Sequence, residues 1–257
     1  MMQETREAVI EQLRRQARKI AARQPQAAFY RDCSREVEIS GKYFRTDPVI
    51  CCLHAFVAGA VNNDYGHGLP HARLVALDAA ALVAVESRRQ GFSEEAGARR
   101  MQLAHCAGLL HDIERRKQHH AKQGAAYARR VLSVYPFAED EVADICTAIA
   151  NHEAFGEFAE MPTKACKMLS DCLYDADKFR FGPDNFTHTV WDMVELSGIS
   201  LERFAALYPR AIAFLEKIRR TFRSPTGREY GPQFIDIGLA IGEQIYDYMK
   251  TELRLAP

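Results

Sequence analysis

The hydrophobic pattern of this chain repeats with the period of an α-helix over most of its length. In the first predicted helix the apolar residues fall three or four positions apart, on one face: Val9, Ile10, Leu13, Ala17 and Ile20. Strict alternation of apolar and polar residues, which is typical of a half-buried strand, is nearly absent. The sequence therefore predicts an all-α fold.

Turn-forming residues divide this pattern into a series of helices. Pro48 and Pro70 suit first turns, and Ser93, followed by two glutamates, suits an N-cap. Helices are predicted at about 5–22, 47–61, 70–87, 93–111, 120–133, 139–152, 163–178, 187–198, 200–222 and 233–254. We expect one multi-helix domain over 46–257. Residues 1–45 form an N-terminal helical extension, either a pair of helices that packs on the core or an interface with a second subunit.

Composition excludes several classes of function. Hydrophobic residues make up 47 % and charged residues 26 %, as in soluble globular proteins, and the formal net charge is +0. The charge provides no field to hold a nucleic-acid polymer or an anionic membrane. No apolar run approaches the ~20 residues of a membrane span, and the first residues lack the apolar region of a signal peptide. We expect a cytoplasmic protein that binds a small molecule. The sequence leaves open whether it forms a homo-oligomer.

The seven cysteines are odd in number and irregularly spaced, which argues against a disulfide framework. Five of them fall inside apolar helical patterns, where a thiol behaves as a small hydrophobic group: Cys51, Cys52, Cys106, Cys146 and Cys166. We therefore predict core thiols rather than metal ligands or nucleophiles.

Several predicted helices carry a polar residue where the apolar stripe would otherwise continue. His152 and Asp177 extend the stripes of their helices, and His120 lies on the apolar face of its own, whereas His119 is rotated by about 100°. A buried aspartate is costly unless it is paired or bound to a metal. Imidazoles and carboxylates that face one core form a nitrogen and oxygen ligand set, suited to Fe, Mn, Co, Ni, Zn or Mg.

His111 and Asp112 are adjacent at the predicted end of a helix. On a continuous helix their side chains point about 100° apart, so they would not chelate one ion as a pair four residues apart does. At a helix C-terminus the backbone can turn enough for both side chains to reach one ion. Asp112 has two oxygens, so it can also bridge to a second ion.

These residues stand in segments that resemble the HD-domain superfamily of metal-dependent phosphohydrolases. The matching segments follow one another in the family's order: YGHGLPHARLV, LAHCAGLLHDIE, HHAKQGAAYARRVL, ANHE and LYDADKF. They run from about residue 65 to residue 180, and a weaker likeness continues in TFRSPTGREYGPQFIDIGLAIGEQIYDYM. The resemblance implies an all-α HD-type core with extra helices at both ends.

The resemblance also implies a metal site. His71 corresponds to the family's first histidine, with His67 as the competing residue, and His111 and Asp112 correspond to its HD pair. Asp177 corresponds to the final aspartate.

Asp175 is the alternative to Asp177, but the helical pattern puts it off the apolar face. His120 and His152 match the two further histidines of the dinuclear members, which implies one or two divalent ions with Asp112 as the bridge. The sequence departs from the dinuclear members here. The segment between Asp112 and His120 is short, and Asn151 precedes His152 where some dinuclear phosphodiesterases have a second histidine. The absence of a GYP segment after Asp112 speaks against a cyclic dinucleotide as substrate.

The remaining histidines have other predicted places. His54 and His105 are expected in the core rather than among the ligands, and His188 on the surface. We expect three nearby phenylalanines to pack in the core rather than to stack on a base: Phe179, Phe181 and Phe186.

The resemblance implies a phosphohydrolase that cleaves a nucleotide or other small phosphate ester through a metal-activated water, with His111 and Asp112 at the catalytic centre. Glu153 or Glu114 is expected to orient a ligand histidine. Five cations near the motifs are expected to bind the substrate: Arg115, Arg116, Lys122, Lys178 and Arg180. Two alternatives stay open, because one ligand set serves several chemistries. They are a di-iron oxygenase of the same fold and a non-catalytic, metal-stabilised nucleotide-binding protein.

Overall fold

The computed structural model describes residues 2–60 and 68–255, with side chains from residue 6 onward. Within these ranges the chain forms twelve α-helices and one π-helix and contains no strand, which confirms the all-α prediction. The elements are α1 (Met2–Ala21), α2 (Ala28–Asp32), α3 (Ser34–Thr46), α4 (Pro48–Ala60), α5 (Leu69–Arg89), α6 (Glu94–Leu110), α7 (His120–Leu132), α8 (Glu139–Ala150), α9 (Lys164–Phe179), η1 (Asn185–Thr189), α10 (Val190–Ser197), α11 (Leu201–Ile218) and α12 (Pro225–Thr251). None of these helices is long and apolar enough to cross a membrane.

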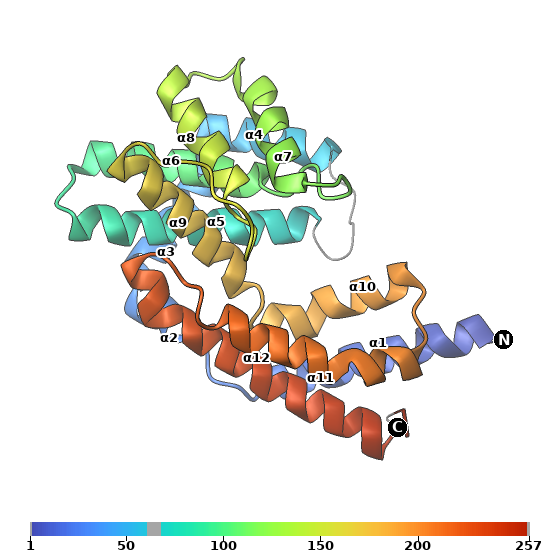
Figure 1. Cartoon of the computed structure of the whole chain (residues 1–257). Coiled ribbons are helices and arrows are strands. Elements are labelled where there is room, and N and C mark those ends of the chain that lie inside the picture. The colour runs from blue at the N-terminus through green and yellow to red at the C-terminus, as the bar shows by residue number, and fades with distance from the viewer. Residues whose placement is uncertain (1, 61–67, 256–257) are drawn as a thin grey trace.

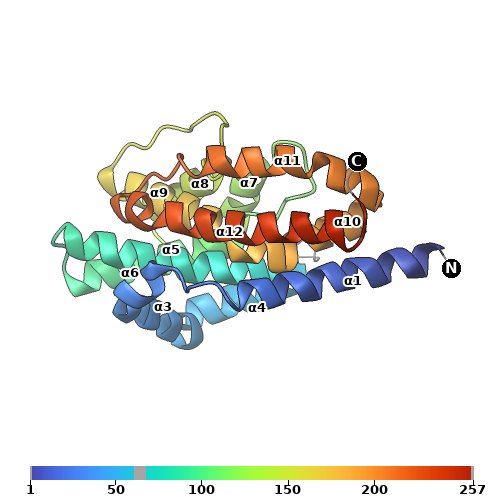
Figure 2. The ribbon, with the colours of Figure 1, turned by 90° about the horizontal axis from the view of Figure 1, so that it is seen from below.

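The helices are arranged in two neighbouring parts (Figure 1). In the upper part α5 packs against α6 and α9, while α7 and α8 pack on each other at one end. In the lower part α11 and α12 run side by side, as Figure 2 also shows, and α1 packs along η1, α10 and α12. Because α9 contacts both α5 and α12, its C-terminal end lies where the two parts meet.

The close packing of α5 on α6 depends on a glycine. A Cβ atom added to Gly108 would lie 2.4 Å from the Cα of Ala76 and 2.6 Å from its backbone nitrogen. Any larger residue would push the two helices apart, because such distances are far below van der Waals contact. This contact brings the first turn of α5 close to the C-terminal end of α6, which are the two places that carry predicted metal ligands.

The junction between α9 and α12 is held by Asp175. This residue is fully buried, and its carboxylate accepts the backbone N–H groups of Arg223 and Ser224, each at 2.8 Å. Ser224 then caps α12 by accepting the N–H of Gly227 at 2.9 Å. The sequence pattern was wrong to put Asp175 off the buried face. The predicted start of α12, at residue 233, was also too late, because the helix begins at Pro225. Ser224 is its N-cap, and Pro232 lies within it.

The cysteine prediction holds only in part. Cys106, Cys146 and Cys166 are buried as expected, but Cys51 and Cys52 are exposed. The prediction was wrong for these two because α4 is apolar around most of its circumference. Only one face of α4 is buried, and it consists of Ile50, Leu53 and Val57.

Candidate metal site

Six predicted ligands lie at the ends of five helices. His71 is in the first turn of α5, and His111 and Asp112 directly follow α6. The other three are the first residue of α7, the second residue after α8 and a residue in the last turn of α9: His120, His152 and Asp177. His67, the alternative first histidine, lies outside the described residues.

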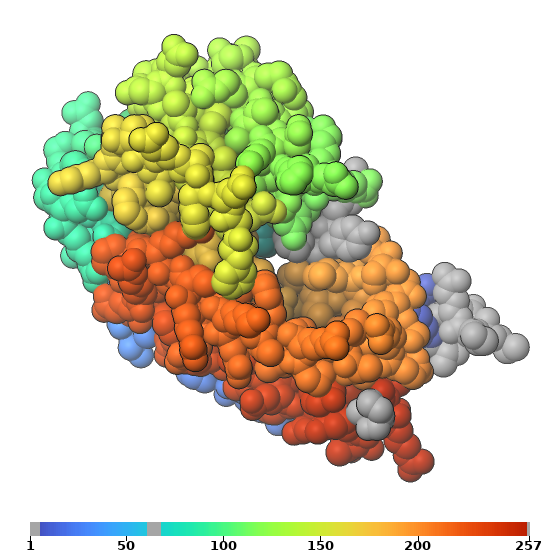
Figure 3. All heavy atoms as spheres, in the orientation of Figure 1, coloured from blue at the N-terminus to red at the C-terminus, as the bar shows by residue number. Residues whose placement is uncertain are grey.

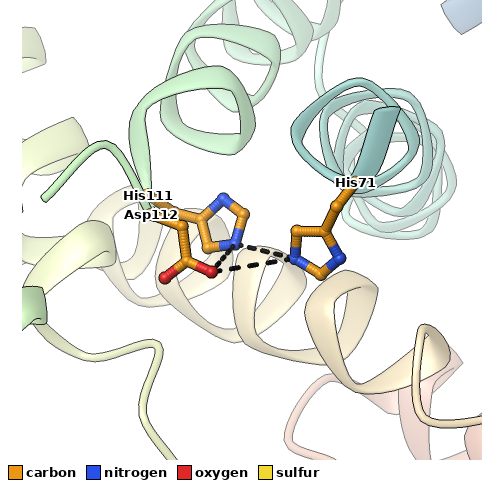
Figure 4. A group of neighbouring side chains, drawn as sticks. All are labelled: His71, His111 and Asp112. Atoms are coloured by element: carbon orange, nitrogen blue, oxygen red, sulfur yellow. Dashed lines mark hydrogen bonds and ion pairs between the residues drawn. The ribbon is translucent and has the colours of Figure 1, made fainter. Parts of the chain in front are cut away.

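We call four residues the inner cluster: His71, His111 and Asp112, which Figure 4 shows, and Asp177. His71 Nε2 lies 3.2 Å from His111 Nε2 and 3.3 Å from Asp177 Oδ1. The Asp112 Oδ2 atom lies 3.5 Å from His111 Nε2 and 3.9 Å from His71 Nε2. Adjacent residues therefore do reach one centre, because α6 ends at Leu110 and the chain turns there. All four residues are buried.

The outer cluster consists of Asp112, His120 and His152. Here the other oxygen of the shared aspartate, Oδ1, lies 3.4 Å from His120 Nε2 and 3.3 Å from His152 Nε2. The two imidazole nitrogens are 3.3 Å apart. In each cluster the ligand atoms of Asp112 and two histidines lie within 4.8 Å of one another, so each group can hold a metal ion.

Hydrogen bonds on the far side of the rings orient three of the four histidines. The Nδ1 atoms of His111 and His152 lie 2.8 and 2.7 Å from the carbonyl oxygens of Gly108 and Ile149. A carbonyl only accepts, so each Nδ1 carries a proton, and the Nε2 atom is the one that faces the cluster. His120 is fixed in the same way, because its Nδ1 lies 3.0 Å from Glu153 Oε1. Such second partners are characteristic of metal-binding histidines.

Asp112 Oδ1 tests whether a cation fits this arrangement. It is buried and forms no hydrogen bond with any described residue, although the Nε2 atoms of His120 and His152 lie 3.4 and 3.3 Å away. Arg115 Nη1, at 3.6 Å, is too distant for a hydrogen bond with it. A buried oxygen of this kind is costly unless a positive charge compensates it closely. A divalent ion between the oxygen and the nitrogens would supply that charge, so the donor set fits a metal.

The protonation states suit metal binding as well. Burial lowers the pKa of His111 to about 3, so its imidazole is neutral near pH 7. Burial opposes charge on Asp112, but His111, His152 and Arg115 together hold the pKa of its carboxyl well below the usual range. Neutral imidazoles and ionised carboxylates are the forms that coordinate metals.

Asp177 is kept ionised by its neighbour in sequence. Burial would raise its pKa, but the ammonium group of Lys178 and the nearby histidines hold it well below the usual range. Lys178 Nζ lies 2.5 Å from Asp177 Oδ2 and donates to the carbonyl of His152 at 3.0 Å. Lys178 therefore ties the end of α9 to the segment after α8, and it leaves Asp177 Oδ1 facing the inner cluster.

Arg115 approaches the outer cluster from the turn after Asp112. Its Nη1 atom donates to His120 Nε2 at 2.8 Å and lies 3.6 Å from Asp112 Oδ1. This hydrogen bond uses the lone pair with which His120 would bind an ion. Burial lowers the pKa of His120, and the charge of Arg115 lowers it further.

A pocket of about 430 Å³ opens onto the outer cluster. Its lining includes the polar side chains of Arg115, Lys178 and Glu153. It also includes two aromatic rings, Phe181 in the turn after α9 and Phe214 of α11. Figure 3 shows the surface hollowed between the yellow-green chain after α8 and the orange helices below it. The site is therefore reached from the region where the two parts of the molecule face each other.

The five predicted substrate-binding cations do not all reach this pocket. Arg115 and Lys178 line it. Lys122 is exposed and pairs with Glu157 at 3.1 Å, and Arg116 is exposed without lining the pocket. Arg180 is buried on the other side of α9, where it bonds to Asp78, Tyr30 at 2.9 Å and Asp184 at 2.5 Å. Arg180 thus joins helices and is not directed at the site.

The remaining histidines follow the predictions except for His54, which was expected in the core and is only half-buried. His105 is fully buried, and its ring packs edge-on against Phe44 with centroids 5.5 Å apart. His54, half-buried, contacts the same ring at 5.3 Å. His119 and His188 are exposed.

Two residues of the pocket lining were not identified from the sequence, Ala154 and Phe214. Phe214 lies on α11, far along the chain from every predicted ligand, and no motif marks it. Phe181, which was expected in the core, is only partly buried and lines the pocket, while Phe179 and Phe186 are buried as predicted. No protein-family model matches the chain, and no match was found among curated proteins or solved structures.

Proposed function

We propose that this protein is a metal-dependent phosphohydrolase that acts on a nucleotide or another small phosphate ester. The observation that carries the proposal is the position of Asp112. One of its oxygens faces the histidines of the inner cluster and the other faces those of the outer cluster. A carboxylate between two sets of imidazoles is a suitable bridge for two divalent ions.

Ions held in this way would acidify a bound water and polarise a phosphoryl oxygen. The chain's own residues have separate tasks. His71, His111 and Asp177 hold the inner position, His120 and His152 hold the outer one, and Asp112 serves both. The second-partner hydrogen bonds of His111, His120 and His152 keep the ligand nitrogens aimed at these positions.

Two cations at the pocket support a phosphate as the reacting group. The guanidinium of Arg115 is partly exposed at the mouth of the outer cluster, where its fork of donors can bind two phosphate oxygens. Lys178 keeps Asp177 ionised and adds positive charge to the pocket. Described side chains of the pocket include no serine or cysteine, so a water is the nucleophile on this proposal.

The test combines metal analysis of the purified protein with a phosphate-release screen. The protein would be assayed with nucleotides and sugar phosphates in the presence of Mn²⁺, Fe²⁺, Co²⁺, Ni²⁺, Zn²⁺ or Mg²⁺. We expect bound metal and release of phosphate from at least one ester, and loss of both in Asp112→Asn. Failure to release phosphate from any ester, together with oxygen uptake by the iron-loaded protein, would instead favour an oxygenase.

A further inference from the structure

Exposed aromatic rings gather at the rim of the metal pocket. Phe155, in the segment after α8, is 62 % exposed, and Phe214 of α11 is 42 % exposed. Their ring centroids are 6.1 Å apart, in an edge-on arrangement. Phe214 also contacts Phe181, with centroids 6.2 Å apart, and these two rings line the pocket itself. Large apolar side chains left open to water beside a pocket are typical of binding sites.

The backbone of Phe155 is strained. Its φ is +62°, in the left-handed region that is unfavourable for a bulky residue. Gly156 follows immediately, and a glycine at position 155 would adopt the same conformation without strain. The chain nevertheless places a phenylalanine there. Strained residues of this kind concentrate at functional sites.

Phe158 provides the contrast within the same segment. It is 57 % exposed, but its ring packs over the guanidinium of Arg223 at 4.3 Å. Arg223 in turn lies over Tyr174 at 3.3 Å and donates to the carbonyl of Asn151 at 2.8 Å. The role of Phe158 is therefore to hold the segment in place. The ring of Phe155 instead contacts that of Phe214, which lines the metal pocket.

The pocket thus combines two kinds of lining. The outer cluster with Arg115 and Lys178 suits an anion, and the rings of Phe181 and Phe214, with Phe155 in contact with Phe214, suit a flat apolar group. The two kinds of lining meet where Lys178 Nζ lies 5.4 Å from the centre of the Phe181 ring. A ligand that contacts both carries a phosphate and a flat aromatic group. Aromatic rings bind such groups by stacking and edge-on contacts, with little dependence on the identity of the base.

We propose that Phe155 and Phe214 form an aromatic subsite for the non-phosphorylated part of the substrate, and that the substrate is a phosphate ester bearing a nucleobase or similar aromatic ring. This inference rests on the proposed function, since it assigns the substrate class of the same site. The subsite draws on both parts of the molecule, because Phe214 belongs to α11 and Phe155 to the non-helical segment after α8.

The test compares two substrates that differ only in the aromatic base, adenosine 5′-monophosphate and ribose 5-phosphate. Values of kcat/KM would be measured on the metal-loaded full chain and on Phe155→Ala, Phe214→Ala and Phe158→Ala. We expect the wild type to prefer the nucleotide by about tenfold, a typical contribution of one stacked base. Phe155→Ala and Phe214→Ala should lose most of this preference, and Phe158→Ala should keep it. An unchanged preference in the first two variants overturns the proposal.

A binding measurement separates this inference from the proposed function. Adenosine, which has no phosphate, would be titrated calorimetrically into the metal-free full chain. Binding by the wild type that is lost in Phe155→Ala and kept in Phe158→Ala supports the subsite even if no ester is hydrolysed. Absence of binding by the wild type, with no preference between the two phosphates, overturns it.

Phe155→Gly adds a readout that separates binding from folding. Because glycine adopts a positive φ freely, this variant should unfold at a higher temperature than Phe155→Ala. Both variants should nevertheless lose the preference for the nucleotide. A Phe155→Gly protein that is relaxed, well folded and fully selective would show that the ring has no part in recognition.

Discussion

The inner and outer clusters share Asp112 but differ in almost every other respect. The inner cluster is buried and has four side chains, and Asp177 within it is kept ionised by Lys178. The outer cluster has three side chains. His120 keeps 12 % of its side-chain surface exposed, and its Nε2 atom already accepts a hydrogen bond from Arg115. The comparison indicates that the two positions bind metal with different strength, the inner more tightly.

The shared aspartate gives the largest expected effect. Asp112→Asn keeps the shape of the side chain but removes the charge that both positions depend on. We expect both ions to be lost, as measured by elemental analysis after gel filtration, while the circular dichroism spectrum keeps its helical form. Asp171→Asn on α9, another buried aspartate, serves as the control, because its partner is Lys167 rather than a predicted ligand. A variant of Asp112 that retains one full equivalent of metal would refute its role as the bridge.

His120→Ala should separate the clusters. It removes a ligand from the outer cluster alone, so the metal content should fall from two ions to one per chain. His119→Ala is the matched control, because His119 is the preceding residue and is exposed. If His120→Ala leaves the metal content unchanged, the protein holds a single ion and the outer cluster has another purpose.

Glu153→Gln tests the support of the outer cluster from behind. Glu153 accepts the Nδ1–H of His120 at 3.0 Å and is 41 % exposed in its side chain. We expect the second ion to bind about tenfold more weakly, the lower end of the usual effect of such partners. Titration of the metal-free protein would measure this affinity, with Glu157→Gln in the same segment as the control. Equal weakening of both ions would contradict an effect confined to the outer cluster.

The helical period and the family resemblance predicted different members of the two clusters. A histidine or aspartate that continues an apolar stripe, such as His152 or Asp177, is expected to face the core. His71 was assigned by the resemblance, and the period misplaced Asp175, which is also buried. What the period does not encode is the packing of distant helices. The pairing of Arg180 with Asp78 and the arrival of Phe214 at the pocket both depend on tertiary contacts between segments with no common motif.

The same reasoning explains the errors in the fold. Asp175 was predicted to lie off the apolar face because the helical pattern indicates one buried stripe. In the structure the C-terminal half of α9 is buried around nearly its whole circumference. The error for Cys51 and Cys52 was the opposite one. Both were predicted to be buried and are exposed, since α4 is apolar on faces that no described helix covers. Hydrophobic periodicity identifies a helix more securely than it counts how many of its faces are covered.

Arg115 provides the smallest and most discriminating effect. Arg115→Gln removes the positive charge 3.6 Å from Asp112 Oδ1 and weakens or removes the hydrogen bond to His120 Nε2. A metal ion at the outer cluster is then repelled less and has better access to the His120 lone pair. The guanidinium is partly exposed, and charge pairs in such positions contribute ~0.2–1 kcal/mol, so we expect the second ion to bind up to about fivefold more tightly. Phosphate release should nevertheless fall, because the same residue is expected to bind the substrate. Lys122→Gln, which removes an equal charge from the exposed face of α7, should change neither quantity. Arg115→Gln should therefore raise metal affinity and lower activity. Glu153→Gln should lower both, because Glu153 only orients a metal ligand. The comparison distinguishes the two roles.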